Sequence, residues 1–244
     1  MDYATFVDHV RHDGRRLAAA ASGNLSIEVP ACPGWTVSDV VSHVAEVYEH
    51  KIVCTELGHA PDPWPPTWHA DRDPVEWLAD AHGRLLRMFE ASGPETPSAT
   101  WWPPDQTVGF WARRMAHETA VHRVDVEAAI GTPTPVDADL AVDGVDEILV
   151  IMLEGDWSDD ADADAAGQRV AISTGGRTWC VTLRRESVEV TPGDEGADAA
   201  ASIAGDPSDV LLWLWGRAPD ACVLRSGDEV ALRLLRSRLV LATQ

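Results

Sequence analysis

Apolar residues in the first 130 positions recur every three to four residues, which is the spacing of amphipathic helices. Thr36 is placed to cap a helix by accepting the backbone N–H of Asp39, and Pro74 stands at a first helical position. Four amphipathic helices joined by loops indicate an α-helical bundle. The helices are expected over residues 2–22, 36–57, 73–91 and a stretch that includes 111–125 and ends near Gly131.

The pattern changes in the second half of the chain. A fifth helix is expected over residues 137–155, followed by an acidic, turn-rich segment at 156–167. Apolar and polar residues then alternate, and Gly175-Gly176 marks a hairpin. Strands are expected over 169–173, 178–183, 187–190 and 199–203, and helices over 207–215 and 229–241.

These patterns predict an α+β protein with two domains. Residues 1–155 are expected to form a four-helix bundle with a further helix. Residues 168–244 are expected to form a smaller α+β domain with an antiparallel sheet. Ser226 has the spacing of a helix-capping residue before the last helix.

Composition narrows the classes of partner. The chain has 40 acidic and 19 basic residues, a net charge of −21, which disfavours binding to nucleic acid or anionic membranes. No signal peptide is visible and the apolar runs are too short to span a bilayer, so a cytoplasmic protein is expected. The four cysteines lack C-x-x-C spacing, which supports neither a disulfide framework nor a thiolate zinc site. The sequence makes no prediction of oligomeric state.

The helix from Trp111 to Asp125 carries the candidate chemistry. Glu118 and His122 are four residues apart, so they lie side by side on one face. A carboxylate and an imidazole are both zinc ligands. His43 has apolar neighbours on its own helix face, so we expect it to point inward and to supply a third ligand. Three protein ligands leave the fourth position open, as in catalytic zinc sites.

Other interpretations of these residues remain open at this point. A glutamate and a histidine four apart also occur on ordinary helices, so the cluster can be a buried polar group without metal. His50 and Cys54 share the helix face of His43 and are competing ligands. His117 is adjacent to Glu118 but faces about 100° away on the helix.

Two segments resemble the mycothiol-dependent maleylpyruvate isomerase family. They are the run from Cys32 to His43, C-P-G-W-T-V-S-D-V-V-S-H, and the run from His117 to Asp125, H-E-T-A-V-H-R-V-D. The second half of the chain, at 204–217 and 226–228, is similar to the sterol-carrier-like C-terminal domain of that family. The resemblance implies a DinB-like metal-binding bundle, with His43, Glu118 and His122 as the metal ligands.

The resemblance also implies the kind of reaction. A divalent metal, zinc being the expected one, would accept a low-molecular-weight thiol such as mycothiol as cosubstrate. Metal coordination deprotonates a thiol that is otherwise mostly protonated at neutral pH. The expected activity is that of a thiol-dependent isomerase or S-transferase acting on a small electrophile. The sequence decides neither between these two outcomes nor which electrophile is used.

Arginines are candidates for substrate recognition. The family has a functional arginine in its C-terminal domain, and Arg217 is the catalytic candidate here, because a guanidinium matches a carboxylate. The alternative is a surface arginine at a helix end. Arg114 is a further candidate, and Arg123 and Asp125 are candidates for an outer shell around the metal or for interdomain contacts. Cys32 is expected to be a packed residue.

A second class of function is a non-enzymatic binding protein with a structural metal. A tryptophan-rich set of residues would then line the groove for an apolar ligand or a partner. An open metal position would favour the enzyme, and a closed one the binding protein. The tryptophans concerned are Trp64, Trp68, Trp77, Trp101 and Trp102.

Overall fold

The computed structural model describes residues 1–64, 72–193, 196 and 198–243. The chain divides into two compact units, Met1–Thr134 and Pro135–Gln244. This division lies N-terminal to the acidic segment at which the sequence places the boundary, because the fifth helix packs with elements of the second unit. Trp68 lies outside the described residues.

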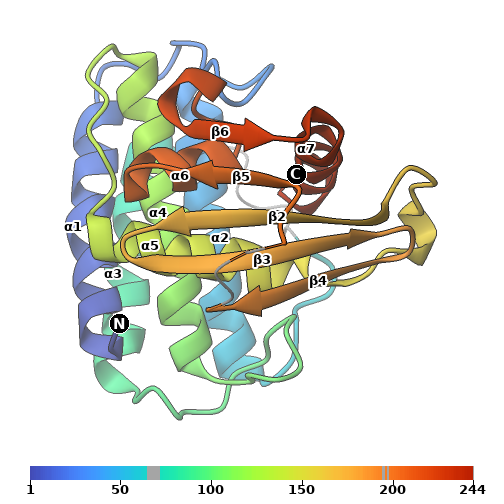
Figure 1. The fold of residues 1–244 in the computed structure, drawn as a ribbon. Coiled ribbons are helices and arrows are strands. Elements are labelled where there is room, and N and C mark those ends of the chain that lie inside the picture. Colours follow the sequence, from blue (N-terminus) through green and yellow to red (C-terminus); the bar gives the residue numbers. More distant parts are fainter. Residues whose placement is uncertain (65–71, 194–195, 197, 244) are drawn as a thin grey trace. The chain divides into compact units, whose positions relative to one another are not determined.

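The first unit contains the four helices that the sequence predicts (Figure 1). Thr36 caps the second helix: its hydroxyl accepts the Asp39 N–H, and the Asp39 carboxylate accepts the Thr36 N–H. Asp73 caps the third helix, and Pro74 occupies its first turn. The bounds are α1 Tyr3–Ala21, α2 Val37–Leu57, α3 Pro74–Ala91 and α4 Val108–Ala129.

Packing in this unit places α4 in the interior. Helix α1 packs on α4, and α2 packs on both α3 and α4. Of the 22 residues of α4, 17 are buried, including several charged ones. Because a buried polar group must find a partner, the charged side chains of α4 have to pair within the bundle.

The second unit combines a six-stranded sheet with helices. The fifth predicted helix appears as α5 and continues into one π-helical segment, η2. Helix α5 packs on α6, and α7 packs on strands β2, β3 and β5. The bounds are α5 Ala138–Glu147, η2 Ile148–Leu153, β1 Gly155–Asp156, η3 Ser158–Asp160, β2 Ala166–Thr174, β3 Arg177–Arg184, β4 Ser187–Pro192, β5 Ala201–Ala204, α6 Pro207–Leu214, η4 Asp220–Cys222, β6 Leu224–Gly227 and α7 Glu229–Ala242.

The sheet has the order β1-β4-β3-β2-β5-β6. Figure 1 labels the strands from β4 through β3, β2 and β5 to β6. The predicted hairpin at Gly175-Gly176 is confirmed, and both glycines have positive φ, as a tight hairpin turn requires. The predicted α+β class is confirmed, but β5 pairs with β2 in parallel, so the sheet expected to be antiparallel is mixed. The reason is that β4 and β5 run in the same direction on opposite sides of the β2–β3 pair.

Two short strands were not predicted from the sequence. Strand β1 extends one edge of the sheet by pairing with β4, and β6 extends the other by pairing with β5. Because β6 includes Ser226, the cap of α7 is Asp228, which accepts the N–H of Val230, and not Ser226 as predicted.

No helix in the described part of the chain has both the length and the apolar character needed to cross a bilayer.

Candidate metal centre

Three side chains from α2 and α4 converge in the first unit. The Nε2 atom of His43 lies 3.1 Å from Oε1 of Glu118, and the Nε2 atom of His122 lies 3.2 Å from the same oxygen. One donor atom from each residue falls within 4.8 Å of those of the other two. The structure therefore brings together the set that the helix spacing and the family resemblance both indicate.

The two oxygens of Glu118 have different partners. While Oε1 faces the imidazoles, Oε2 accepts from Nη2 of Arg114, one helical turn earlier on α4. Burial by itself would raise the pKa of Glu118, but Arg114 and the two histidines outweigh it and hold that pKa well below its ordinary value. Glu118 is thus an ionised carboxylate with one oxygen directed at the histidines. The sequence suggested Arg114 only for substrate recognition, although its spacing of four residues from Glu118 could have predicted this contact.

A second carboxylate orients His122. Asp125 Oδ2 lies 3.0 Å from His122 Nδ1, so the opposite ring nitrogen faces Glu118. Burial disfavours protonation of His122, but the hydrogen bonds to Asp125 and Glu118 prevail and raise its pKa to about 9. The thiol of Cys32 donates to the same Asp125 oxygen at 3.6 Å. Cys32, His122 and Asp125 form an alternative group of three possible ligands.

Access to the cluster is uneven. The side chain of His43 is 37% exposed, whereas those of Glu118 and His122 are 12% and 10% exposed. The ring of Trp35 lies 5.2 Å from that of His43, centroid to centroid, and restricts its orientation. Of the three side chains, that of His43 is the most open to solvent.

His117 and Arg123, which belong to the same segment of α4, contact residues outside the group around Glu118. His117 is fully buried and packs edge-on against Phe6 of α1, on another face of α4. Arg123 pairs with Asp13 of α1 and with Glu127, at 3.1 and 2.7 Å. Arg123 therefore links α1 to α4 and is not part of the group around Glu118.

The donor set fits a divalent metal such as zinc. Two imidazole nitrogens and one carboxylate oxygen are typical zinc ligands, and three protein ligands are typical of catalytic sites. The Asp125 contact to His122 Nδ1 is the arrangement usually found behind a metal-bound imidazole. Both histidines direct Nε2 at the same carboxylate oxygen, so their donor atoms converge on one point.

The described tryptophans of the predicted groove make separate contacts, and the groove itself stays a prediction. Trp77 is buried and donates to Glu49 of α2. Trp101 and Trp102 instead contact Phe110 at the start of α4, with ring centroids 5.2 and 6.0 Å away. Trp64 contacts the ring of His50, and Trp68 lies outside the described residues.

Arg217 belongs to the second unit, just beyond the end of α6. Its Nη1 donates to the carbonyl of Trp215 at 2.8 Å, and its guanidinium carbon lies 5.7 Å from the Trp215 ring centroid. A cation next to the carbonyls at a helix C-terminus is electrostatically favourable. These contacts account for its position at the helix end, and a role in substrate recognition stays a prediction.

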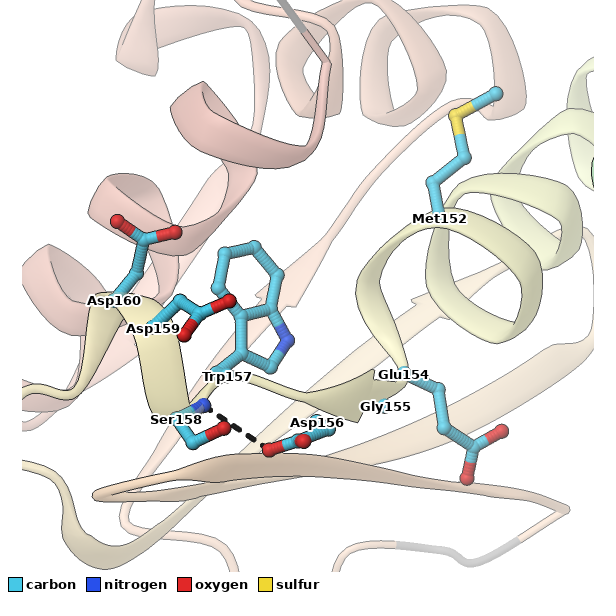
Figure 2. Close-up of a pocket in the computed structure, with 8 residues that line it drawn as sticks. All are labelled: Met152, Glu154, Gly155, Asp156, Trp157, Ser158, Asp159 and Asp160. Carbon is cyan, nitrogen blue, oxygen red and sulfur yellow. Dashed lines mark hydrogen bonds between the residues drawn. The ribbon is translucent and has the colours of Figure 1, made fainter.

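The second unit also contains a hollow of about 310 Å³ (Figure 2). Carboxylates surround much of it, and the indole of Trp157 stands between them. The backbone N–H of Ser158 donates to Asp156, which closes the turn in this wall. A hollow with this lining does not suit an apolar ligand. Its lining residues are Met152, Glu154, Gly155, Asp156, Trp157, Ser158, Asp159 and Asp160.

Comparisons with known proteins identify a similar family and similar solved structures. Residues 7–127 match the family described as the mycothiol maleylpyruvate isomerase N-terminal domain. The crystal structure of the mycothiol-dependent maleylpyruvate isomerase is similar, with 15% sequence identity, a TM-score of 0.63, and coverage of 93% of this chain and 95% of that one. A histidine-to-alanine variant of that enzyme matches with 13% identity and the same TM-score and coverage. No curated protein sequence matches the chain.

The structural match extends over both units, so the bundle and the mixed sheet together have the fold of that isomerase. The sequence match covers α2 and α4, the helices that carry His43, Glu118 and His122. The helical unit of this chain belongs to the mycothiol maleylpyruvate isomerase N-terminal domain family.

Proposed function

We propose that this chain is a divalent-metal-dependent enzyme that uses a low-molecular-weight thiol, of the mycothiol type, to isomerise or to modify a small electrophile. The observation that carries the proposal is the convergence of His43 Nε2 and His122 Nε2 on one oxygen of an ionised Glu118. Family membership supports the thiol as cosubstrate.

The residues of the chain supply orientation and charge. His43, Glu118 and His122 would hold the metal, and Asp125 would keep His122 in the required tautomer. Arg114 keeps Glu118 ionised before any metal binds. A divalent metal at this position supplies the positive charge that keeps a coordinated thiol deprotonated near neutral pH.

The thiolate is the nucleophile in either outcome. Its sulfur forms a bond to an electrophilic carbon of a conjugated double bond, and the electron pair of that bond moves to the conjugated carbonyl. The former double bond is then free to rotate. If the thiolate leaves, the double bond re-forms as the other isomer and the thiol is regenerated. If a proton is added to carbon instead, the thiol adduct is the product.

Arg217 is our candidate for binding a carboxylate of the substrate, since a guanidinium and a carboxylate form paired hydrogen bonds. Substitution by lysine would keep the charge and lose this geometry. An increase in KM for Arg217→Lys with little change in kcat is the expected result. An unchanged KM would remove Arg217 from the proposal.

Metal analysis tests the ligand set. Purified protein should contain one equivalent of divalent metal, and the His43→Ala, Glu118→Ala double variant should contain almost none while the bundle stays folded. His50→Ala is the matched control, because His50 shares the helix face of His43 but contacts Cys54 and Lys51 instead. Full metal occupancy in the double variant would refute the assignment. A metal that binds but never responds to thiols would favour the binding-protein alternative.

A further inference from the structure

The only lysine of the chain, Lys51, lies in a polar cluster outside the proposed ligand set. It follows His43 by eight residues on α2, which is about 12 Å along the helix axis. Its Nζ lies 4.6 Å from the ring centroid of Trp111, which precedes Glu118 by seven residues on α4. The cluster thus lies about two helical turns from the candidate metal centre, along the same pair of helices.

The surroundings of the Lys51 ammonium group are well fixed. The indole Nε1 of Trp111 donates to Ser98 Oγ at 3.0 Å and to the Ala99 carbonyl at 3.1 Å, which sets the plane of the ring beside Nζ. His50 Nδ1 lies 3.2 Å from Nζ. Burial, reinforced by the charge of Lys51, lowers the pKa of His50 to about 4. His50 is therefore neutral at pH 7, and its Nδ1 accepts a hydrogen bond from Lys51.

None of these neighbours carries a negative charge. Cys54 Sγ lies 3.5 Å from His50 Nδ1, and burial raises the pKa of this thiol, so it stays protonated. Among the residues that the structure describes, no carboxylate oxygen lies within 4 Å of Lys51 Nζ. Arg114, by contrast, contacts Glu118 directly.

A largely buried ammonium with no carboxylate oxygen within 4 Å among the described residues is costly, and such groups are normally paired. Burial accordingly lowers the pKa of Lys51 to about 8, although the charge of Glu118 opposes this. The chain has 40 acidic residues, so a shortage of acids does not explain why none of the described ones lies beside Lys51. The residue as a whole is of intermediate exposure and not fully buried.

We propose that Lys51, positioned by His50 and Trp111, binds the carboxylate of the electrophile whose reactive carbon lies at the metal centre. The ammonium supplies the charge, the neutral His50 directs its protons, and the indole face of Trp111 lies beside the bound group. The assignment of this carboxylate to the substrate rests on the proposed function, whereas anion binding at Lys51 does not. The ligand class is a small unsaturated organic acid.

A single lysine makes the test direct. Protein grown with lysine ¹³C-labelled at Cε gives one lysine side-chain signal, that of Lys51. Titrating the zinc-loaded protein with succinate at constant ionic strength should shift this signal saturably, and dimethyl succinate should not shift it. An equal response to the diester, or a response that never saturates, overturns the proposal. A saturable response to mycothiol but not to succinate overturns the assignment to the electrophile.

Calorimetry with variants gives a second readout. Lys51→Met should weaken succinate binding at least about tenfold, which corresponds to about 1.4 kcal/mol. Arg87→Met is the matched control, because it removes the same charge from an exposed position of α3 and should leave binding unchanged. Equal losses in the two variants overturn the proposal. If Lys51→Met does not fold, the labelled wild-type titration decides.

The same titration separates this inference from the metal proposal. In the His43→Ala, Glu118→Ala variant, the Lys51 signal should still respond to succinate, because no proposed metal ligand lies within 4 Å of Nζ. Loss of metal with a preserved response supports anion binding. Wild-type protein that binds metal and thiol but shows no Lys51 response overturns this inference and leaves the proposed function intact.

Discussion

Helix α4 contributes to two groups of charged side chains, one shared with α1 and one shared with α2. The two groups differ in how their charges are paired. Toward α1, Arg123 contacts both Asp13 and Glu127, and Arg16 adds a second guanidinium 2.7 Å from Glu127. We call these four residues the closed cluster. Toward α2, Glu118 has one guanidinium partner and two imidazoles that share its other oxygen; with His43, His122 and Arg114 it forms the open cluster.

The comparison indicates how ion pairs that join two helices differ from a group whose donor atoms could hold a metal. In the closed cluster each carboxylate meets a permanent cation, and the pairs join α1 to α4. In the open cluster the donor atoms converge, and one of the contributing side chains is 37% exposed. Exposure does not separate the two clusters, because the Arg16 side chain of the closed cluster is 33% exposed. The two imidazoles and the convergence of their nitrogens on one oxygen carry the distinction.

The largest expected effect concerns the closed cluster. Arg123→Met leaves Asp13 and Glu127 buried with less positive charge, so the free energy of unfolding should fall by about 3–5 kcal/mol. Urea denaturation measures this loss. Arg11→Met, at a partly exposed arginine of α1, should change stability by no more than about 0.5 kcal/mol. Metal content per folded molecule should stay at the wild-type level in both variants. A metal-free Arg123→Met protein that keeps its stability would reverse the roles given to the two clusters.

A smaller effect, on metal affinity, is expected from Asp125, which contacts His122 of the open cluster. Asp125→Asn weakens the hydrogen bond to His122 Nδ1. Loss of such a hydrogen bond to a metal-binding histidine typically lowers metal affinity 10- to 100-fold. Chelator competition followed by metal analysis measures the affinity. Asp8→Asn serves as the control, because Asp8 is an exposed acid on α1 and its loss changes the net charge equally. Equal affinities in the two variants would show that Asp125 does not act through His122.

The smallest expected effect is a dependence of stability on pH. Burial raises the pKa of Asp13 above its ordinary value, although Arg123 and Arg16 oppose the shift. The folded protein therefore favours protonated Asp13, and its stabilising contribution falls as pH rises from 3.8 through the raised pKa. The stability of the wild type relative to Asp13→Asn should decline over that range in urea unfolding series. A relative gain in stability with rising pH would contradict the assigned sign.

The sequence predicted the helical unit well because its signals are local. The Thr36 capping box, Pro74 and the spacing of Glu118 and His122 each act within one or two helical turns. The convergence of His43 on the same point depends on the packing of α2 against α4. For His43, helix patterning indicated an inward direction and a place as third ligand beside Glu118 and His122, with His50 and Cys54 as competitors. The family motif then favoured His43.

Features that depend on distant contacts were not predictable in this way. The parallel pairing of β5 with β2 depends on which side of the sheet the chain reaches after β4, and no local pattern encodes that choice. The surroundings of Lys51 combine α2, the segment before α4 and α4 itself. Arg123 follows His122 directly, yet it contacts α1 because successive helix positions face about 100° apart.

Binding of a thiol to the cobalt-substituted protein tests the central claim most directly. Cobalt should occupy the site of His43, Glu118 and His122, and its absorption spectrum reports the ligands around it. Titration with mycothiol should produce a new sulfur-to-metal band in wild-type protein, and the band should be absent from the His43→Ala, Glu118→Ala variant. A wild-type spectrum that stays unchanged with mycothiol and with other cellular thiols would contradict a thiol-binding metal centre at these residues.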